Sequence, residues 1–218
     1  MKKIKILIAD DHKITRQGLR SLLENEPDME VAAEADEGRS AVRIACELKP
    51  DVVIMDVSMP DLNGMEATRQ IVRKQPSIKI VALSMHSDNM FVTEMLKSGV
   101  SGYLLKDCAF EELSSAIRSV IDGKTYLSPA ISGVIVNGYL NRLTNPQSAD
   151  SEVLTDRERE ILQMISEGKT TKQIALKLHI SIKTVETHRR KIMNKLNMFN
   201  VAELTKYAIR KGLTSLEK

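Results

Sequence analysis

The sequence predicts an α/β protein in which a five-stranded, doubly wound parallel sheet precedes a second, smaller all-α domain, a four-helix fold containing a helix-turn-helix. Three observations predict this. Short apolar runs alternate with amphipathic helical stretches over residues 1–122, the pattern of a parallel sheet covered on both faces. Residues 153–218 carry helical patterns only. Residues 151–218 hold 14 Lys and Arg against 8 Asp and Glu, whereas residues 1–150 hold 18 against 21, so the basic part is the candidate for nucleic-acid binding.

Five strand-then-helix units account for residues 1–122. The apolar runs have the length of buried strands, and the stretches between them place apolar residues at helical spacing. The strands are expected near 4–9, 29–34, 51–55, 78–83 and 100–105, and the helices near 13–25, 37–48, 63–75, 88–97 and 109–121. Right-handed crossovers then fit the strand order 2-1-3-4-5, which brings the ends of the first and third strands together.

Residues 123–152 are expected to link the two domains. Ser128 followed by Pro129 is typical of a helix start, with a capping residue and then proline at the first helical position. A linker helix is therefore expected over roughly 129–143. Residues 145–151 have little to bury, and their composition is typical of a flexible tether.

Four helices are expected in residues 153–218. Thr155 and Glu158 have the spacing of a capping box at the start of the first helix. Thr170 and Gln173 have the same spacing before a second, short helix. Two short-linked helices, of which the later is longer and basic, are the pattern of a helix-turn-helix.

The third helix of this tail is the predicted DNA-reading helix. Ser181 would cap it, and it would run to about residue 196. Its apolar stripe of Val185, Ile192 and Leu196 would pack on the second helix, which leaves the opposite face for a major groove. A fourth helix is expected over about 200–211.

The groove-facing side of the third helix supplies the candidate DNA contacts. We expect phosphate contacts from Lys183, Thr184 and Lys191, base contacts from Glu186, Thr187 and Arg190, and Asn194 on the same face. Arg190 can pair bidentately with guanine, and Glu186 can accept from cytosine. For His188, which falls on or beside the apolar stripe, packing is favoured over base contact.

Polar residues follow four of the predicted strands. Asp10 and Asp11 follow the first, Asp56 the third, Ser84 the fourth and Lys106 the fifth. Ligand sites of an open α/β sheet form at the carboxyl ends of its strands, so these residues predict one pocket. Three converging carboxylates repel one another, and a hard divalent cation removes that conflict, which makes Mg²⁺ the expected cofactor.

The same pocket suits phosphoryl transfer to an aspartate. Asp56 is the expected nucleophile. The backbone carbonyl of Ser58 is expected to complete a metal shell with Asp10, Asp11 and Asp56. The Ser84 hydroxyl and the Lys106 ammonium would each bind a phosphoryl oxygen.

Four short segments carry these residues: Ile8-Ala-Asp-Asp-His12, Met55-Asp-Val-Ser-Met-Pro60, Ser84, and Gly102-Tyr-Leu-Leu-Lys106. Over residues 1–122 they resemble the flavodoxin-like receiver domain of bacterial response regulators. The resemblance implies that Asp56 is the phosphoacceptor, that Asp11 binds Mg²⁺ directly, and that Tyr103 changes rotamer on activation. Many receivers have proline after the lysine, where this chain has Asp107, so a cis peptide is not expected there.

The tail carries a second set of motifs, among them Leu154-Thr-Asp-Arg-Glu-Arg-Glu-Ile161 and Thr184-Val-Glu-Thr-His188. Over residues 153–212 they resemble the LuxR-type DNA-binding domain, so the whole chain resembles the NarL/FixJ class. This implies a transcriptional regulator that a sensor histidine kinase phosphorylates, and that then forms a homodimer and binds double-stranded operator DNA. Many members have lysine or arginine in place of Glu186, a difference that bears on sequence preference.

The fourth helix supplies a dimer contact in that family. The resemblance therefore makes Val201 and Leu204 dimer candidates, with packing in the domain core as the alternative.

Two other functions remain open on the residues alone. Asp56 could serve a phosphohydrolase, although such enzymes usually carry a second acid two residues later, where this chain has Ser58. The receiver could also act as an interaction module that is never phosphorylated. We expect no turnover enzyme, and neither a nucleotide-binding glycine loop nor a dinucleotide fingerprint is present.

The sequence also indicates where in the cell the protein is expected. No apolar run approaches the roughly 18 residues of a membrane span, and no signal-peptide pattern opens the sequence, so a cytoplasmic protein without a membrane partner is expected. Cys46 and Cys108 are expected to be reduced thiols, and the four histidines lack metal-ligand spacing.

Overall fold

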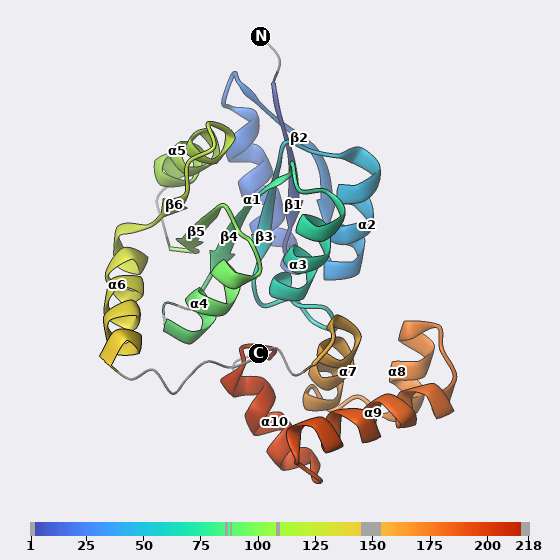
Figure 1. The fold of residues 1–218 in the computed structure, drawn as a ribbon. Helices are drawn as coiled ribbons and strands as arrows, with labels where there is room; N and C mark the ends of the chain where they lie inside the picture. Colours follow the sequence, from blue (N-terminus) through green and yellow to red (C-terminus); the bar gives the residue numbers. More distant parts are fainter. Residues whose placement is uncertain (1–2, 86, 88, 108–109, 145–153, 215–218) are drawn as a thin grey trace. The chain divides into compact units, whose positions relative to one another are not determined.

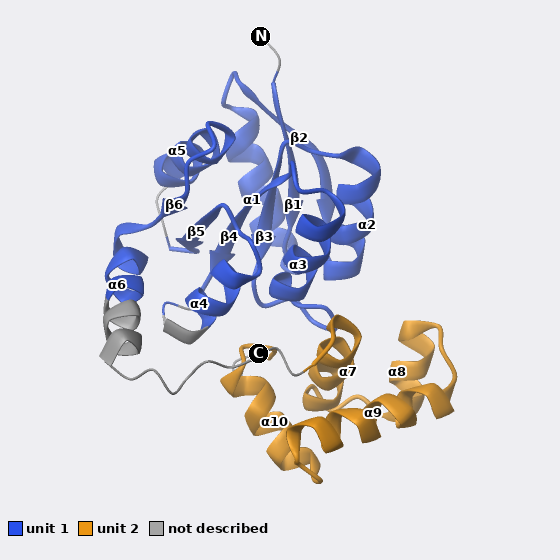
Figure 2. Cartoon of the chain, in the orientation of Figure 1, with its two compact units in different colours: residues 1–141 blue, residues 142–218 orange. Residues whose placement is uncertain are grey.

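The computed structural model describes residues 3–85, 87, 89–107, 110–144 and 154–214. The chain forms two compact units, Met1–Asn141 and Arg142–Lys218 (Figure 2). Among the described residues, no helix is both long enough and apolar enough to cross a membrane. The tether predicted over 145–151 and Cys108 lie outside the described residues, and Cys46 is a free thiol.

The first unit alternates strands and helices along the chain (Figure 1). Its strands are β1 (Ile4–Ala9), β2 (Met29–Ala35), β3 (Val52–Asp56), β4 (Lys79–Ser84), β5 (Gly102–Leu105) and β6 (Tyr126–Leu127). Its helices are α1 (Lys13–Glu24), α2 (Gly38–Leu48), α3 (Gly64–Lys74), α4 (Asn89–Lys97), α5 (Phe110–Ile121) and α6 (Pro129–Thr144). The predicted α/β fold is confirmed, and the predicted strand and helix positions agree with these bounds to within a few residues.

The sheet is parallel throughout, with the order β2-β1-β3-β4-β5-β6. The predicted order of the first five strands is therefore confirmed. β1 lies next to β3, with Ala9 opposite Met55. Asp10, the residue after β1, and Asp56, the last residue of β3, are therefore at neighbouring positions of the sheet edge.

The sheet has six strands, and the predicted number of five is wrong. In β6, Tyr126 lies opposite Gly102 and Leu127 opposite Tyr103. Two residues are too few to produce the alternation that identifies a strand in a sequence. Hydrogen bonds on either side hold the segment in place, from the amide of Tyr126 to the carbonyl of Ser101 (3.0 Å) and from the amide of Ser128 to the carbonyl of Tyr103 (3.1 Å).

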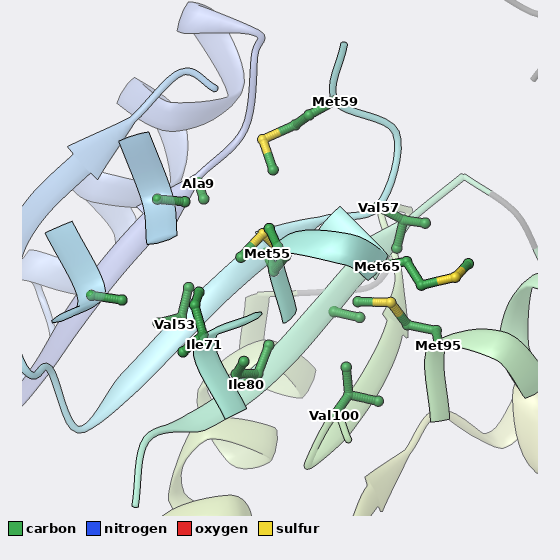
Figure 3. Packing of buried hydrophobic residues seen from close by; sticks show 14 of the residues in the cluster. Ala9, Val53, Met55, Val57, Met59, Met65, Ile71, Ile80, Met95 and Val100 are labelled. Carbon is green, nitrogen blue, oxygen red and sulfur yellow. The ribbon is translucent and has the colours of Figure 1, made fainter. Parts of the chain in front are cut away.

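Two apolar clusters cover the two faces of the sheet. Alternate residues of a strand point to opposite faces, so Leu7 joins one cluster while Ile6 and Ile8 join the other. The first cluster contains residues of α2, α3 and α4, and Figure 3 labels some of its members, including Met55, Ile71 and Met95. The second contains residues of α1 and α5. The helices thus cover both faces and leave the carboxyl edge of the strands for the polar residues.

The start of α6 is part of the first unit. The helix begins at Pro129, as predicted, and Ile131 is fully buried in the cluster that contains Met55. The Ser128 hydroxyl is buried without a hydrogen bond among the described residues, so the expected side-chain cap is absent. The carbonyl of Ser128 instead accepts from the amide of Ile131 at 2.9 Å. The predicted receiver boundary at residue 122 therefore leaves out a strand and a helical turn that pack on this unit.

The second unit contains α7 (Asp156–Ser166), α8 (Thr171–Leu178), α9 (Ile182–Leu196) and α10 (Val201–Arg210). Both predicted capping boxes are present, at the starts of α7 and α8, and the Ser181 hydroxyl caps α9 by accepting from the amide of Thr184 at 3.0 Å. Val185 and Ile192 are buried in one cluster with Ile174 and Leu178, with Leu196 partly buried against it. The predicted four-helix, helix-turn-helix domain is confirmed.

Candidate phosphoacceptor pocket and DNA-reading face

The carboxyl edge of the sheet brings three of the predicted pocket residues into direct contact. The Lys106 ammonium lies 2.8 Å from Oδ2 of Asp10 and 2.9 Å from Oδ2 of Asp56. These side chains come from the ends of β5, β1 and β3, which are separated by up to 96 positions in the sequence. One cation therefore bridges two carboxylates at the place where the sequence predicts a single pocket.

This contact is shielded from water. The side chains of Asp10 and Asp56 are 2% and 3% exposed, and that of Lys106 is 16% exposed. Burial raises the pKa of the Asp56 carboxyl, and the charge of Asp10 adds to this increase, while Lys106 opposes it. Burial alone would lower the pKa of Lys106, but the charges and hydrogen bonds of Asp56 and Asp10 outweigh it and raise that pKa. Lys106 thus remains a cation that favours the ionised form of Asp56.

Four side chains at this edge offer ligand atoms within 4.8 Å of one another: Asp10, Asp11, His12 and Asp56. Oδ1 of Asp11 is shielded from solvent and accepts no hydrogen bond from the described residues. Such an oxygen is costly to bury unless a cation or donor compensates it. The donor set therefore fits a divalent cation bound by carboxylates. His12 was not among the predicted ligands, because its spacing to the other histidines gives no metal pattern.

The loop after β3 holds Asp56 in place. The amide of Ser58 donates to Oδ1 of Asp56 at 3.2 Å, and the amide of Gly64 donates to the carbonyl of Val57 at 3.0 Å. A Cβ atom at Gly64 would lie 1.9 Å from the carbonyl oxygen of Asp56, so only glycine allows the two backbones to approach this closely. The Asn63 side chain caps α3 by accepting from the amide of Glu66 at 2.9 Å. The metal role predicted for the Ser58 carbonyl stays a prediction.

Ser84 and Tyr103 both occupy buried positions, on the adjacent strands β4 and β5. Ser84 ends β4 with a fully buried side chain, and its carbonyl accepts from the amide of Lys106 at 2.8 Å. Tyr103, on β5, is fully buried in the apolar cluster that also contains Phe91 and Ile131. The peptide bonds of the described residues are all trans, in agreement with the expectation at Asp107.

The groove-facing side of α9 is exposed in full. All seven predicted contact residues are exposed: Lys183, Thr184, Glu186, Thr187, Arg190, Lys191 and Asn194. Two of their hydroxyls are already engaged. The Thr184 hydroxyl lies 2.8 Å from that of Ser181, and the Thr187 hydroxyl donates to the carbonyl of Lys183 at 2.9 Å. The Thr187 hydroxyl is therefore already used as a donor within α9.

His188 is half-buried beside Val185, which agrees with packing rather than base contact. Its Nδ1 atom is shielded from solvent and has no hydrogen-bond partner among the described residues.

An ion pair that the sequence does not indicate joins α9 to the start of α7. The Lys195 ammonium lies 2.6 Å from Oε2 of Glu158, whose side chain is only 4% exposed. Burial alone would raise the pKa of the Glu158 carboxyl, but the hydrogen bonds from Lys195 and Thr155 outweigh it and lower that pKa. The carboxylate therefore serves both the capping box of α7 and a contact with α9. The two partners are 37 positions apart in the sequence, so local sequence patterns do not indicate the pair.

The two dimer candidates on α10 differ. Leu204 is fully buried in the core of the second unit with Ile161 and Ala208, which agrees with the alternative of core packing rather than with a dimer contact. Its side chain faces the interior because it shares the buried face of α10 with Ala208. Val201 is 41% exposed and remains a candidate.

Comparison with protein families gives two matches. Residues 6–118 match the response regulator receiver domain, and residues 152–208 match the bacterial regulatory proteins of the luxR family.

Similar proteins extend over almost the whole chain. The oxygen regulatory protein NreC of Staphylococcus carnosus is 40% identical and covers 96% of this chain and 99% of its own length. The solved structure of the RcsB response regulator of Salmonella typhimurium is 28% identical, with a TM-score of 0.58 over 95% of this chain and 98% of its own. A structure of two RcsB dimers bound to two parallel DNAs is 27% identical, with a TM-score of 0.59 over 96% of this chain and 99% of its own.

Proposed function

The chain belongs to the response regulators of the NarL/FixJ class, and from this premise we propose that a sensor histidine kinase transfers a phosphoryl group to Asp56. The protein is a phosphorylation-dependent transcriptional regulator with a receiver domain and a LuxR-type DNA-binding domain. The observation that carries the assignment of Asp56 is its place in the pocket, where the Lys106 ammonium lies 2.9 Å from Asp56 and 2.8 Å from Asp10.

The transfer is a displacement at phosphorus. A carboxylate oxygen of Asp56 forms the new O–P bond, and the N–P bond to the kinase histidine breaks with its electron pair going to the imidazole. Asp10, Asp11, Asp56 and the Ser58 carbonyl would hold Mg²⁺, which neutralises charge on the phosphoryl oxygens when it is bound. The Lys106 ammonium, which contacts Oδ2 of Asp56, would then pair with a phosphoryl oxygen instead.

The phosphoryl group would then be detected by residues on the two neighbouring strands. The Ser84 hydroxyl would donate to one phosphoryl oxygen and Lys106 to another, which draws β4 and β5 toward the new charge. Tyr103 lies on β5 and is fully buried, so a change in its rotamer alters the packing of the cluster around it. Phosphorylation acts as a population shift, because the charge stabilises one of two existing arrangements.

The output would be operator binding through α9. Lys183, Thr184 and Lys191 contact phosphates, and Glu186, Thr187 and Arg190 meet base edges, with Asn194 on the same face. The RcsB dimers bound to DNA support binding as a homodimer, in which symmetry sets the spacing of two half-sites. Val201 on α10 is the exposed candidate for a contact between the two DNA-binding domains. We place the protein in the cytoplasm, where it turns over no substrate.

Phosphate incorporation from acetyl phosphate in the presence of Mg²⁺ tests this function. The wild-type chain and Asp36→Asn, which alters an exposed acid outside the pocket, should gain acid-stable, base-labile phosphate. Asp56→Asn should gain none, because the carboxylate nucleophile is gone. Equal labelling of Asp56→Asn would overturn the assignment. Turnover of a small phosphate ester by the wild type would instead support the phosphohydrolase alternative.

A further inference from the structure

Among the described residues, four side chains at the carboxyl edge of the sheet could hold a metal ion. His12 is the member of this group that offers a nitrogen atom, and the other three offer carboxylate oxygens. It follows Asp10 and Asp11 directly and occupies the N-cap position of α1. Its backbone amide donates to Oδ1 of Asp10 at 2.8 Å, so the position of the residue is fixed against the pocket.

The imidazole lies at ligand distance from both neighbouring carboxylates. Nδ1 of His12 is 2.9 Å from Oδ1 of Asp11 and 3.4 Å from Oδ1 of Asp10. The shorter separation is that of an ion pair, which the two side chains form when the imidazole is protonated and which a bound metal ion would replace. When two ligand atoms each bind one metal ion at about 2.1 Å and the angle at the ion is about 90°, the two atoms lie about 3.0 Å apart. Nδ1 and Oδ1 of Asp11 already have this separation.

The ring has no evident structural role. It makes no side-chain capping bond to α1, and its side chain is 69% exposed. Among the described residues, its side chain makes polar contacts with the carboxylates of Asp10 and Asp11. Removing the ring therefore leaves the helix start and the apolar cores intact.

The chemical identity of a ligand atom determines which metal ions it binds well. Imidazole suits Co²⁺, Ni²⁺ and Zn²⁺, whereas Mg²⁺ prefers an all-oxygen shell with several waters. We propose that His12 is a nitrogen donor to the metal site, through which the site binds borderline transition-metal ions, while Mg²⁺ binds through oxygen alone. This inference rests on the proposed metal site at Asp10, Asp11 and Asp56.

Titration calorimetry of the full chain with CoCl₂ and with MgCl₂ tests the inference. His12→Ala should weaken Co²⁺ binding by about ten-fold or more and change Mg²⁺ binding by less than about two-fold. The visible absorption of bound Co²⁺ should also shift when the nitrogen ligand is lost. His179→Asn is the matched control. It removes an exposed imidazole from the second unit, and Asn tolerates the left-handed backbone there (φ 52°). Its titrations should match the wild type.

The outcomes separate the two claims. If Asp11→Asn loses both ions but His12→Ala binds Co²⁺ as the wild type does, the metal site stands and the role of His12 is refuted. Equal losses of Co²⁺ and Mg²⁺ in His12→Ala also refute a nitrogen donor that selects between ions. If the wild type binds neither ion, or if Asp11→Asn binds both normally, the proposed metal site itself is overturned.

Discussion

The amide of Ser128 donates a 3.1 Å hydrogen bond to the carbonyl of Tyr103, which ties the residue after β6 to the strand that leads to Lys106. One helical turn later, Ile131 is fully buried in the same apolar cluster as Tyr103. The linker therefore begins as part of the receiver's sheet and core, and its first turn packs in the same cluster as Tyr103.

The first prediction concerns this attachment. Ile131→Ala should destabilise the receiver by about 2–5 kcal/mol, because it removes a buried side chain and leaves a cavity. Val136→Ala, on the same helix at a position that is 57% exposed, should change stability by no more than about 0.5 kcal/mol. Urea unfolding of the full chain, followed by circular dichroism, measures both. Equal effects of the two substitutions would mean that α6 is not anchored through Ile131.

The second prediction concerns the close approach at Gly64. Gly64→Ala should destabilise the receiver and slow labelling by acetyl phosphate, because the new Cβ would overlap the carbonyl of Asp56. Gly18→Ala is the matched control, since Gly18 lies in α1 with nothing within 4 Å of an added Cβ. That substitution should stabilise the chain by up to about 1 kcal/mol through helix propensity. Normal labelling of Gly64→Ala would show that the loop can shift without moving the carboxylate.

The third prediction concerns the pair between Glu158 and Lys195. Glu158→Gln should cost the second unit about 1–3 kcal/mol at neutral pH, because it removes a shielded charged hydrogen bond. Glutamine still completes a capping box, as Gln173 does at the start of α8, so the substitution isolates the ion pair.

The pH dependence of that cost has a definite sign. The pKa of Glu158 is lower in the folded state, so its stabilisation is complete above the unfolded pKa and is lost as the pH falls through the folded one. The wild type and Glu158→Gln should therefore converge in strong acid. Denaturation followed by NMR signals of α7 and α9 checks this. A difference that is independent of pH would contradict an ionic contribution.

The fourth prediction concerns base readout by α9. Arg190→Ala should weaken binding to an operator selected with phosphorylated protein by about 1–3 kcal/mol and relax its sequence preference. Arg210→Ala removes an exposed guanidinium from α10 and should leave both properties nearly unchanged. Fluorescence anisotropy with operator and scrambled duplexes measures them. Equal loss on both duplexes would assign Arg190 to a phosphate rather than to a base.

The parts of the molecule that the sequence predicts are those with a repeating local signal. The apolar runs predicted the strands. The polar residues at their ends predicted that Asp10, Asp56 and Lys106 meet at the carboxyl edge of the sheet. Capping residues such as Thr155 marked helix starts because the bonds they form span only three residues.

The features that the sequence does not predict depend on long-range packing. β6 exists because β5 offers it an edge, and the contact of Lys195 with Glu158 joins two distant helices. Which apolar residue of α10 faces inward depends on where that helix docks, so Leu204 could not be separated from Val201 beforehand. His12 lacked the spacing of known histidine sites, and although it adjoins Asp10 and Asp11 in the sequence, only the fold brings Asp56 to the same place.

The loop after β3 divides the pocket into a fixed part and an adjustable part. Gly64 and the cap at Asn63 hold the backbone around Asp56, while the Ser58 side chain is exposed and takes no part in that packing. Substitutions at position 58 can therefore alter the surroundings of Asp56, the proposed phosphoacceptor, at little cost in folding. Under the proposed function, such a substitution would change how long the phosphoryl group persists on Asp56 and leave the surrounding architecture as it is.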